Sequence, residues 1–276
     1  MGERRLAVHV LDTRIEIVLQ GRDTDELFAR AEEAWSLALA PNTDVDAVVV
    51  ADLLPEGGQR HHRAVGWEPK PGKPWAFAEP DAGRLLMLLT QYVTSAAIKE
   101  QSGRLLMLHA AGLAHPQTGK ASIWVAPGNM GKSTLVRTLG PSFCYLTDET
   151  IAIRRDGTIA PYAKPVSTRV HEAAGVKEER APGPLGLSLA DIAARPAGLV
   201  FLERDATHEG PAQITELDTL SAIEAAVPES SAFMVTDKPL QWLANILEST
   251  GGARRVRYAE ASDLLPLARE IMGEAP

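Results

Sequence analysis

The sequence predicts an α/β protein in which a small α+β domain, residues 1–100, precedes a larger α/β domain, residues 101–276. Two patterns carry this prediction. Near the start, apolar and polar residues alternate and then give way to helical spacing, as expected of a small α+β unit. From about residue 105, short apolar runs typical of buried strands alternate with helical segments, the order found in α/β domains.

The first domain begins with two segments of alternating residues, 6–11 and 15–19, separated by three polar residues. This pattern is typical of a β-hairpin. Asp23 or Thr24 can cap the next segment, in which apolar residues recur at helical spacing as far as Leu39. A helix is therefore expected directly after the hairpin.

The rest of the first domain is expected to contain a strand, a proline-rich segment and a long helix. Valines cluster over 44–51 and predict a strand. Prolines crowd the segment 68–80, which we expect to be an excursion without helix or central strand. Asp81 can then cap a helix over 82–99, whose leucines spread over a wide apolar face.

The second domain is expected to contain five strands and five helices. The expected strands are at 105–113, 122–125, 143–146, 198–202 and 255–258. The expected helices are at 133–139, 189–194, 221–227, 240–247 and 261–272.

Composition excludes several classes of protein. The chain has 28 basic and 36 acidic residues and a formal charge of −8, which argues against binding of a nucleic-acid backbone. A single cysteine, Cys144, cannot form an internal disulfide. No apolar stretch reaches the roughly 18 residues of a membrane span, so we expect a cytoplasmic protein without a membrane partner.

The strongest motif is Ala-Pro-Gly-Asn-Met-Gly-Lys-Ser-Thr at 126–134, which matches the phosphate-binding pattern G-x-x-x-x-G-K-[ST] except at Ala126. A predicted strand precedes it and a predicted helix follows it, as this motif requires. The alternative is a glycine turn that binds no ligand. The expected nucleotide-binding residues are Gly128, Asn129, Met130, Gly131, Lys132, Ser133 and Thr134.

The motif predicts a nucleoside triphosphate and Mg²⁺ as ligands, and ATP is the expected nucleotide. Small residues let the backbone wrap an anion, and the amides at a helix N-terminus face the phosphates. Lys132 would reach the β and γ oxygens, and the Ser133 hydroxyl would ligate Mg²⁺. The motif leaves the choice between ATP and GTP open.

Two flanking segments make the prediction more specific. Leu-His-Ala-Ala-Gly at 108–112 lies one strand before the loop, and Leu-Thr-Asp-Glu-Thr at 146–150 lies one helix after it. Together with Lys-Pro-Val-Ser at 164–167, this order resembles the catalytic domain of HPr kinase/phosphorylase and its shorter relatives. The resemblance covers about 105–167.

The resemblance implies a P-loop fold of the HPr kinase and phosphoenolpyruvate carboxykinase type, and phosphoryl transfer from a nucleotide to a serine hydroxyl. It implies that Asp148 is the general base and that Glu149 is a metal or water ligand beside it. Asp148 follows the predicted strand 143–146, so we expect it at the carboxyl end of a strand beside the loop strand, where open sheets place ligands.

Three further residues are candidates for the site. His109 matches the family's active-site histidine and would stabilise developing charge, the alternative being a buried structural histidine. Lys164 and Arg204 are candidate phosphate contacts, or else surface charges. The chain departs from the family loop at Ala126, Gly128 and Asn129, of which Gly128 replaces a serine.

The sequence therefore predicts an ATP-dependent kinase acting on a hydroxyl of a protein, a peptide or a small molecule. Two alternatives stay open: a nucleotide-binding sensor or assembly protein that transfers nothing, and a P-loop NTPase that hydrolyses ATP with water. The acceptor is unidentified, and a homo-oligomer is left open.

Overall fold

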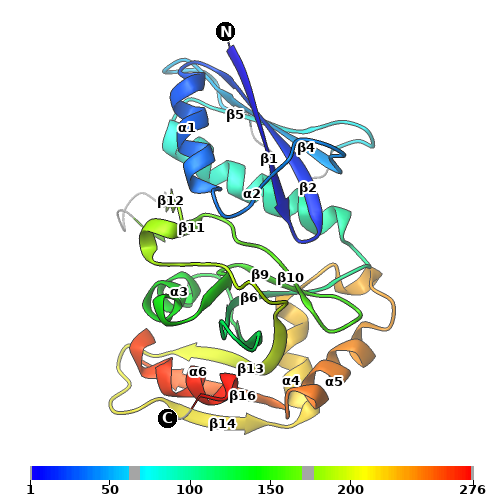
Figure 1. The fold of residues 1–276 in the computed structure, drawn as a ribbon, viewed down its shortest axis with the longest axis vertical. Helices are drawn as coiled ribbons and strands as arrows, with labels where there is room; N and C mark the ends of the chain where they lie inside the picture. The colour runs from blue at the N-terminus through cyan, green and yellow to red at the C-terminus, as the bar shows by residue number, and fades with distance from the viewer. Residues whose placement is uncertain (1, 62–68, 170–176, 275–276) are drawn as a thin grey trace. The chain divides into compact units, whose positions relative to one another are not determined.

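A computed structural model describes residues 2–61, 69–169 and 177–274 of the chain (Figure 1). The chain divides into two compact units. Unit 1 comprises Met1–Gln101 and Ala163–Gly183, and unit 2 comprises Ser102–Tyr162 and Pro184–Pro276. The segment Ala163–Gly183 thus belongs to unit 1, whereas the sequence predicts it in the second domain. Sheets and helices are mixed in the chain, which confirms the predicted α/β fold class.

The expected hairpin opens unit 1. Strands β1 (Gly2–Val10) and β2 (Thr13–Gly21) pair antiparallel along their whole length. The two turn residues, Leu11 and Asp12, have φ values of 49° and 56°. A two-residue turn with positive φ at both positions matches the twist of the flanking strands.

Helix α1 (Thr24–Ala34) follows the hairpin but ends earlier than predicted. Leu39, expected in that helix, lies in the short strand β3 (Leu39–Ala40) instead. The side chain of Leu39 is 43% exposed, so it adds nothing to the buried face of the helix. Pro41 also disfavours helical backbone in the residue before it.

The five strands of unit 1 form a sheet in the order β3-β1-β2-β4-β5. Strand β4 (Ala47–Leu53) confirms the predicted strand, but β5 (Trp75–Glu79) lies inside the segment predicted to be an excursion. Pro74 and Pro80 flank β5, and β5 is an edge strand, a position that tolerates nearby prolines. Glu68, at the start of that segment, lies outside the described residues.

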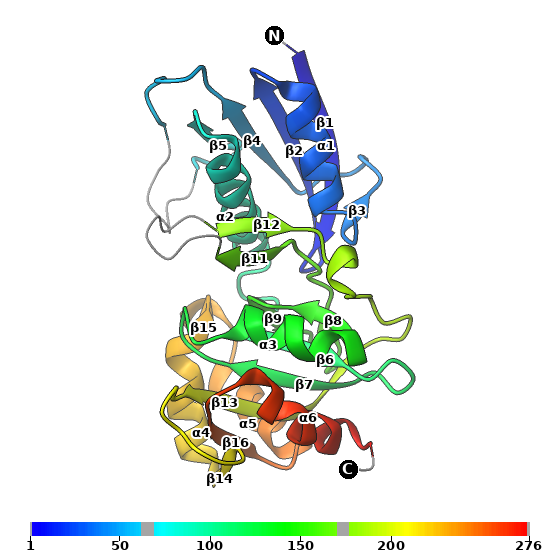
Figure 2. The ribbon, with the colours of Figure 1, turned by 90° about the vertical axis from the view of Figure 1, so that its left-hand side faces the viewer.

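Helix α2 (Ala82–Glu100) confirms the long predicted helix, and the Asp81 carboxylate accepts a hydrogen bond from the Arg84 amide at 2.7 Å. Helices α1 and α2 cover one face of the sheet (Figure 2). A hairpin of β11 (Val166–Arg169) and β12 (Lys177–Arg180) packs on α2, which explains why this segment belongs to unit 1.

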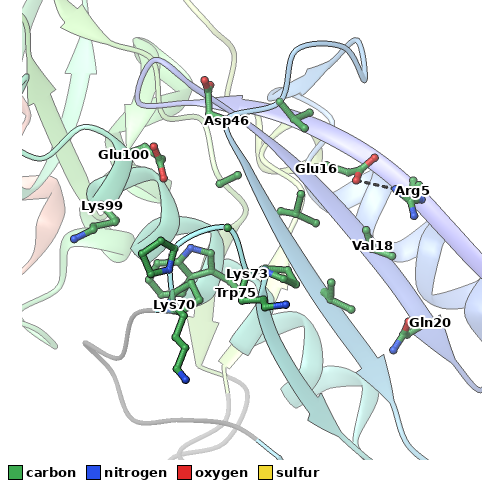
Figure 3. A pocket seen from close by; sticks show the side chains of 18 of the residues that line it. Arg5, Glu16, Val18, Gln20, Asp46, Lys70, Lys73, Trp75, Lys99 and Glu100 are labelled. Atoms are coloured by element: carbon green, nitrogen blue, oxygen red, sulfur yellow. Dashed lines mark hydrogen bonds and ion pairs between the residues drawn. The ribbon is translucent and has the colours of Figure 1, made fainter.

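The other face of this sheet carries an open pocket of about 770 Å³ (Figure 3). Side chains of β2 such as Glu16 and Val18 line it, alternating with Ile15 and Ile17, which are fully buried under the helices. Arg5 donates to Glu16 at 2.9 Å across the sheet in this pocket.

Unit 2 is built on a nine-stranded sheet with the path β10-β9-β6-β7-β13-β16-β14, and β8 and β15 also pair with β6. Strands β7, β13 and β16 are parallel, and β6 is antiparallel to all four of its neighbours. The strands are β6 (Leu106–Ala114), β7 (Lys120–Val125), β8 (Cys144–Thr147), β9 (Thr150–Ile153), β10 (Ile159–Ala160), β13 (Arg195–Arg204), β14 (Gln213–Leu217), β15 (Ser230–Ser231) and β16 (Ala253–Tyr258).

Helices cover both faces of this sheet (Figure 2). One face carries α3 (Lys132–Leu139) and α6 (Leu265–Met272), and the other carries α4 (Thr219–Ala226) and α5 (Pro239–Ser249). The helix predicted at 189–194 is wrong, because these residues form no helix. Leu189 and Ile192 are 42% and 44% exposed, so the segment has no apolar face to bury.

Among the described residues, no helix combines the length and the apolar character needed to cross a membrane.

Gly21 at the end of β2 is predicted to be essential for the stability of unit 1. Its φ is 101°, and a Cβ there would lie 2.3 Å from the Leu53 carbonyl oxygen. We expect Gly21→Ala to lower the free energy of unfolding by about 2 kcal/mol or more, through strain and this clash, as measured by urea denaturation. Gly57→Ala is the control, because Gly57 also has a positive φ (78°) but no described residue comes within 4 Å of a Cβ built there. Equal losses in both variants would contradict the close approach.

Candidate functional site

The loop 126–131 connects strand β7 to helix α3, in the strand–loop–helix order that the motif requires. Gly131 is the N-cap of α3 and has a φ of 92°. Asn129 has a φ of 69°, a left-handed backbone that asparagine tolerates better than most residues. The loop therefore ends at the N-terminus of α3, where the first backbone amides of the helix have no partner within the helix.

Strand β6 changes its partners at His109 on both edges. On one edge, β15 pairs with Met107 and Leu108 and β7 pairs from Ala110 onward. On the other edge, β9 pairs as far as His109 and β8 pairs from Gly112 onward. The loop leaves the sheet from β7 at this point, and the turn containing Asp148 and Glu149 lies between β8 and β9.

Backbone hydrogen bonds tie these segments together. The Ala126 amide donates to the His109 carbonyl at 3.4 Å, and the Ala110 amide donates to the Glu149 carbonyl at 3.0 Å. One detail differs from the expectation: Asp148 follows a strand that neighbours β6, and β6 separates it from the loop strand β7. The loop and the acidic turn nevertheless meet, as the side chains show.

Asp148 contacts the first turn of α3. Its Oδ2 accepts a hydrogen bond from the Ser133 hydroxyl at 2.5 Å, and its Oδ1 accepts one from the Tyr145 hydroxyl at 3.3 Å. The Asp148 side chain is buried, with 4% of the residue exposed. The Thr147 hydroxyl accepts from the Glu149 amide at 3.1 Å and shapes the turn.

Lys132 lies against its own loop. Its Nζ donates to the carbonyl oxygens of Ala126 at 2.5 Å and Pro127 at 3.0 Å, and the residue is 6% exposed. An ammonium group buried to this degree needs such acceptors. The side chain thus folds back over the loop that the motif predicts to bind phosphate.

His109 lies near this lysine and contacts a carboxylate that the sequence analysis did not identify. Its Nδ1 is 3.1 Å from Oε2 of Glu229. Burial lowers the pKa of His109, and the positive charge of Lys132 lowers it further, against the opposing effects of Glu229 and Glu149. The neutral imidazole is therefore favoured.

Two residues at the ends of parallel strands adjoin the other side of the loop. The Tyr258 hydroxyl donates to the Met130 carbonyl at 3.2 Å, and burial raises the pKa of Tyr258. Arg204 is exposed, and its Cδ would lie 3.7 Å from a Cβ on Gly131. Arg204, Tyr258 and the loop all lie at the carboxyl ends of their strands, where open sheets bind ligands.

The remaining candidates lie on the loop, on α3 and in unit 1. In the part of the chain that the structure describes, no atom lies within 4 Å of a Cβ built on Gly128, so this position has room for a side chain. Thr134 is exposed on α3. Lys164 belongs to unit 1, where it is 1% exposed and donates to the Pro165 carbonyl at 2.8 Å. Its role as a phosphate contact stays a prediction.

Sequence reasoning missed Glu229, Tyr145 and Tyr258. Glu229 is 120 residues from His109 in the chain, and no spacing pattern links them. Tyr258 ends a strand that was predicted, so the alignment of parallel strand ends is a signal that could have found it.

The described residues contain no group of three or more His, Cys, Asp or Glu side chains arranged to hold a metal ion. A Mg²⁺ ion bound together with a nucleotide does not need one, because one or two carboxylates and the phosphate oxygens hold it.

Comparison with protein-family models gives no match, and comparison with curated proteins gives none either. Among solved structures, the chain is similar to the HPr(Ser) kinase/phosphatase from Coxiella burnetii, with 11% sequence identity and a TM-score of 0.32. The match covers 60% of this chain and 93% of that one. A likeness this weak carries no inference about activity.

The lowered pKa of His109 predicts how it titrates. Because the folded state binds its proton less tightly than the unfolded state, its contribution to stability is complete above about pH 6.5 and is lost as pH falls through the folded pKa. We expect Lys132→Ala to raise the pKa of His109, measured by NMR titration of its ring protons. Lys120→Ala, at the opposite end of β7, should leave this pKa unchanged; an unchanged value in Lys132→Ala would contradict the proximity of the two charges.

Proposed function

We propose that unit 2 binds ATP through residues 126–134 and transfers its γ-phosphate to a hydroxyl group, as an ATP-dependent phosphotransferase. The observation that carries this proposal is the hydrogen bond of the Ser133 hydroxyl to Asp148, beside Lys132 at the N-terminus of α3. In P-loop enzymes, a serine or threonine at this position and an aspartate at a strand end share one magnesium ion.

Ser133 and Asp148 fit Mg²⁺ because they bring a hydroxyl oxygen and a carboxylate oxygen within 2.5 Å of each other at one end of the loop. When bound, Mg²⁺ would neutralise charge on the phosphates. This contact supports a metal-side role for Asp148, in place of the general-base role expected from the resemblance. Glu149, half-buried in the same turn, remains the other candidate ligand.

The hydrogen bonds of Lys132 to the loop carbonyls support the proposal. Its ammonium group is held by two carbonyl oxygens of the loop, so it has only to exchange them for phosphate oxygens to serve a bound nucleotide. Arg204, exposed beside Gly131, is the second cation available to the phosphates. Phosphoryl transfer depends mostly on such positioning and charge stabilisation.

The alternatives differ in the fate of the bound nucleotide. A sensor would bind ATP without cleaving it, and an NTPase would use water as its acceptor. Both retain the Ser133 and Asp148 pair, so the geometry of this pair does not separate them from a kinase. The kinase is preferred because the resemblance at 105–167 extends beyond the loop.

Binding of ATP depends on Lys132 if this proposal is right. We expect isothermal titration calorimetry to detect binding of magnesium ATP by the wild-type chain, weakened at least about tenfold in Lys132→Ala, since one charge-assisted hydrogen-bond donor is lost. Lys120→Ala is the control, because it removes the same charge at the far end of β7. No binding by the wild-type chain, or equal binding by Lys132→Ala, would refute nucleotide binding at the loop.

Asp148→Asn tests the chemistry separately from the binding. The variant should still bind ATP in the absence of Mg²⁺, but its magnesium-dependent release of phosphate from ATP should fall at least about tenfold, because an amide is a poorer ligand than a carboxylate. Asp191→Asn, an exposed carboxylate of the same unit, should match the wild-type rate. A wild-type chain that binds ATP but releases no phosphate to water or to any hydroxyl would favour the sensor.

A further inference from the structure

Glu229 lies beside one of the two ring nitrogens of His109. Its Oε2 lies 3.1 Å from Nδ1 of His109, and the two side chains are 16% and 36% exposed. An ionised carboxylate only accepts hydrogen bonds, so Nδ1 must be the nitrogen that donates. The neutral ring then keeps its lone pair on Nε2.

Main-chain pairing holds this contact in place. Strand β15 runs antiparallel to β6, with Ser230 opposite Leu108. Glu229 precedes Ser230 and His109 follows Leu108, so the register sets the glutamate opposite the histidine. Pro228 fixes the backbone φ one residue earlier. The pair is therefore fixed by the sheet and is not a chance meeting of two long surface side chains.

The ring of His109 lies on the side of the sheet that carries the loop. Leu108 and Ala110 belong to the apolar core that contains Trp242 and Leu243 of α5. Side chains alternate along a strand, so His109 is on the opposite face, the one covered by α3. Lys132 at the start of α3 is close enough to lower the pKa of His109, which favours the neutral ring.

On the basis of the proposed function, we propose that Glu229 is a positioning residue that holds His109 as its Nδ1–H tautomer, so that Nε2 accepts a hydrogen bond from the attacking hydroxyl. His109 then recognises a donor, an alcohol or a water molecule. With its lone pair on Nε2, the neutral ring does not donate from that nitrogen to a phosphate oxygen, so it does not stabilise developing charge there, which was the expectation from the sequence.

The transfer step balances with this assignment. The hydroxyl oxygen forms a bond to the γ-phosphorus while the bond from that phosphorus to the bridging oxygen breaks. The hydroxyl proton passes to Nε2 of His109, and ADP leaves with the electron pair of the broken bond. Glu229 stabilises the resulting imidazolium through its existing contact with Nδ1.

Nitrogen chemical shifts test the tautomer directly. The full chain is labelled with ¹⁵N-histidine, and the His109 signals are identified by their loss in His109→Gln. In the neutral ring we expect Nδ1 to carry the proton in the wild-type chain and this preference to be lost in Glu229→Ala. Glu224→Ala is the matched control, because Glu224 is an exposed glutamate on the neighbouring helix α4. A wild-type ring protonated at Nε2 would overturn the proposal.

Kinetics test whether Glu229 acts through His109. With magnesium ATP and water as the acceptor, Glu229→Ala should lower kcat for phosphate release at least about tenfold with little change in KM. In a His109→Gln background the same substitution should have no further effect. A loss confined to KM, or an equal loss in both backgrounds, would show that Glu229 is only structural.

The two proposals fail in different ways. A wild-type chain that neither binds nor cleaves ATP refutes the proposed function, and with it the role of Nε2 toward an attacking hydroxyl. The nitrogen shifts need no nucleotide, so they still decide whether Glu229 sets the tautomer.

Discussion

The register of strand β6 is the constraint on which the candidate site depends. At His109, both edges of β6 change from one partner strand to another. The loop from β7 and the turn between β8 and β9 both emerge at this point, so Lys132, Asp148 and Glu229 converge on it although 97 positions separate the first from the last. A slip of one residue would turn the His109 ring into the apolar core and expose Leu108 in its place.

Most of the fold could be predicted because its elements follow local rules. The hairpin, the Asp81 cap and helix α2 each show a period or a capping residue in the sequence. The failures occurred where tertiary context decides. The segment 189–194 has helical spacing but no surface to bury it against, and β5 forms between prolines because β4 offers it a partner edge. Helical spacing also continued to Leu39, beyond the true end of α1.

The residues of the candidate site likewise fall into those that local sequence predicts and those that depend on tertiary structure. The loop and its lysine could be found from sequence because phosphate binding needs fixed residue types at fixed spacing within one strand–loop–helix unit. The contact of Asp148 with Ser133 could not, since it depends on how two strands pair around β6. The contact of Glu229 with His109 could not be predicted from the sequence, because the two-residue strand β15 brings Glu229 to His109 from a distant part of the chain.

Unit 1 is discontinuous in the chain, and this affects the order in which the protein can be made. Its last strands, β11 and β12, are synthesised only after β6 to β10 of unit 2. The first hundred residues therefore emerge without the strands that pack on α2, and both units must wait for later sequence before either is complete. A fragment ending at residue 101 would lack β12 and leave part of α2 uncovered. Truncating the chain directly after its first 101 residues would therefore not give a complete unit 1.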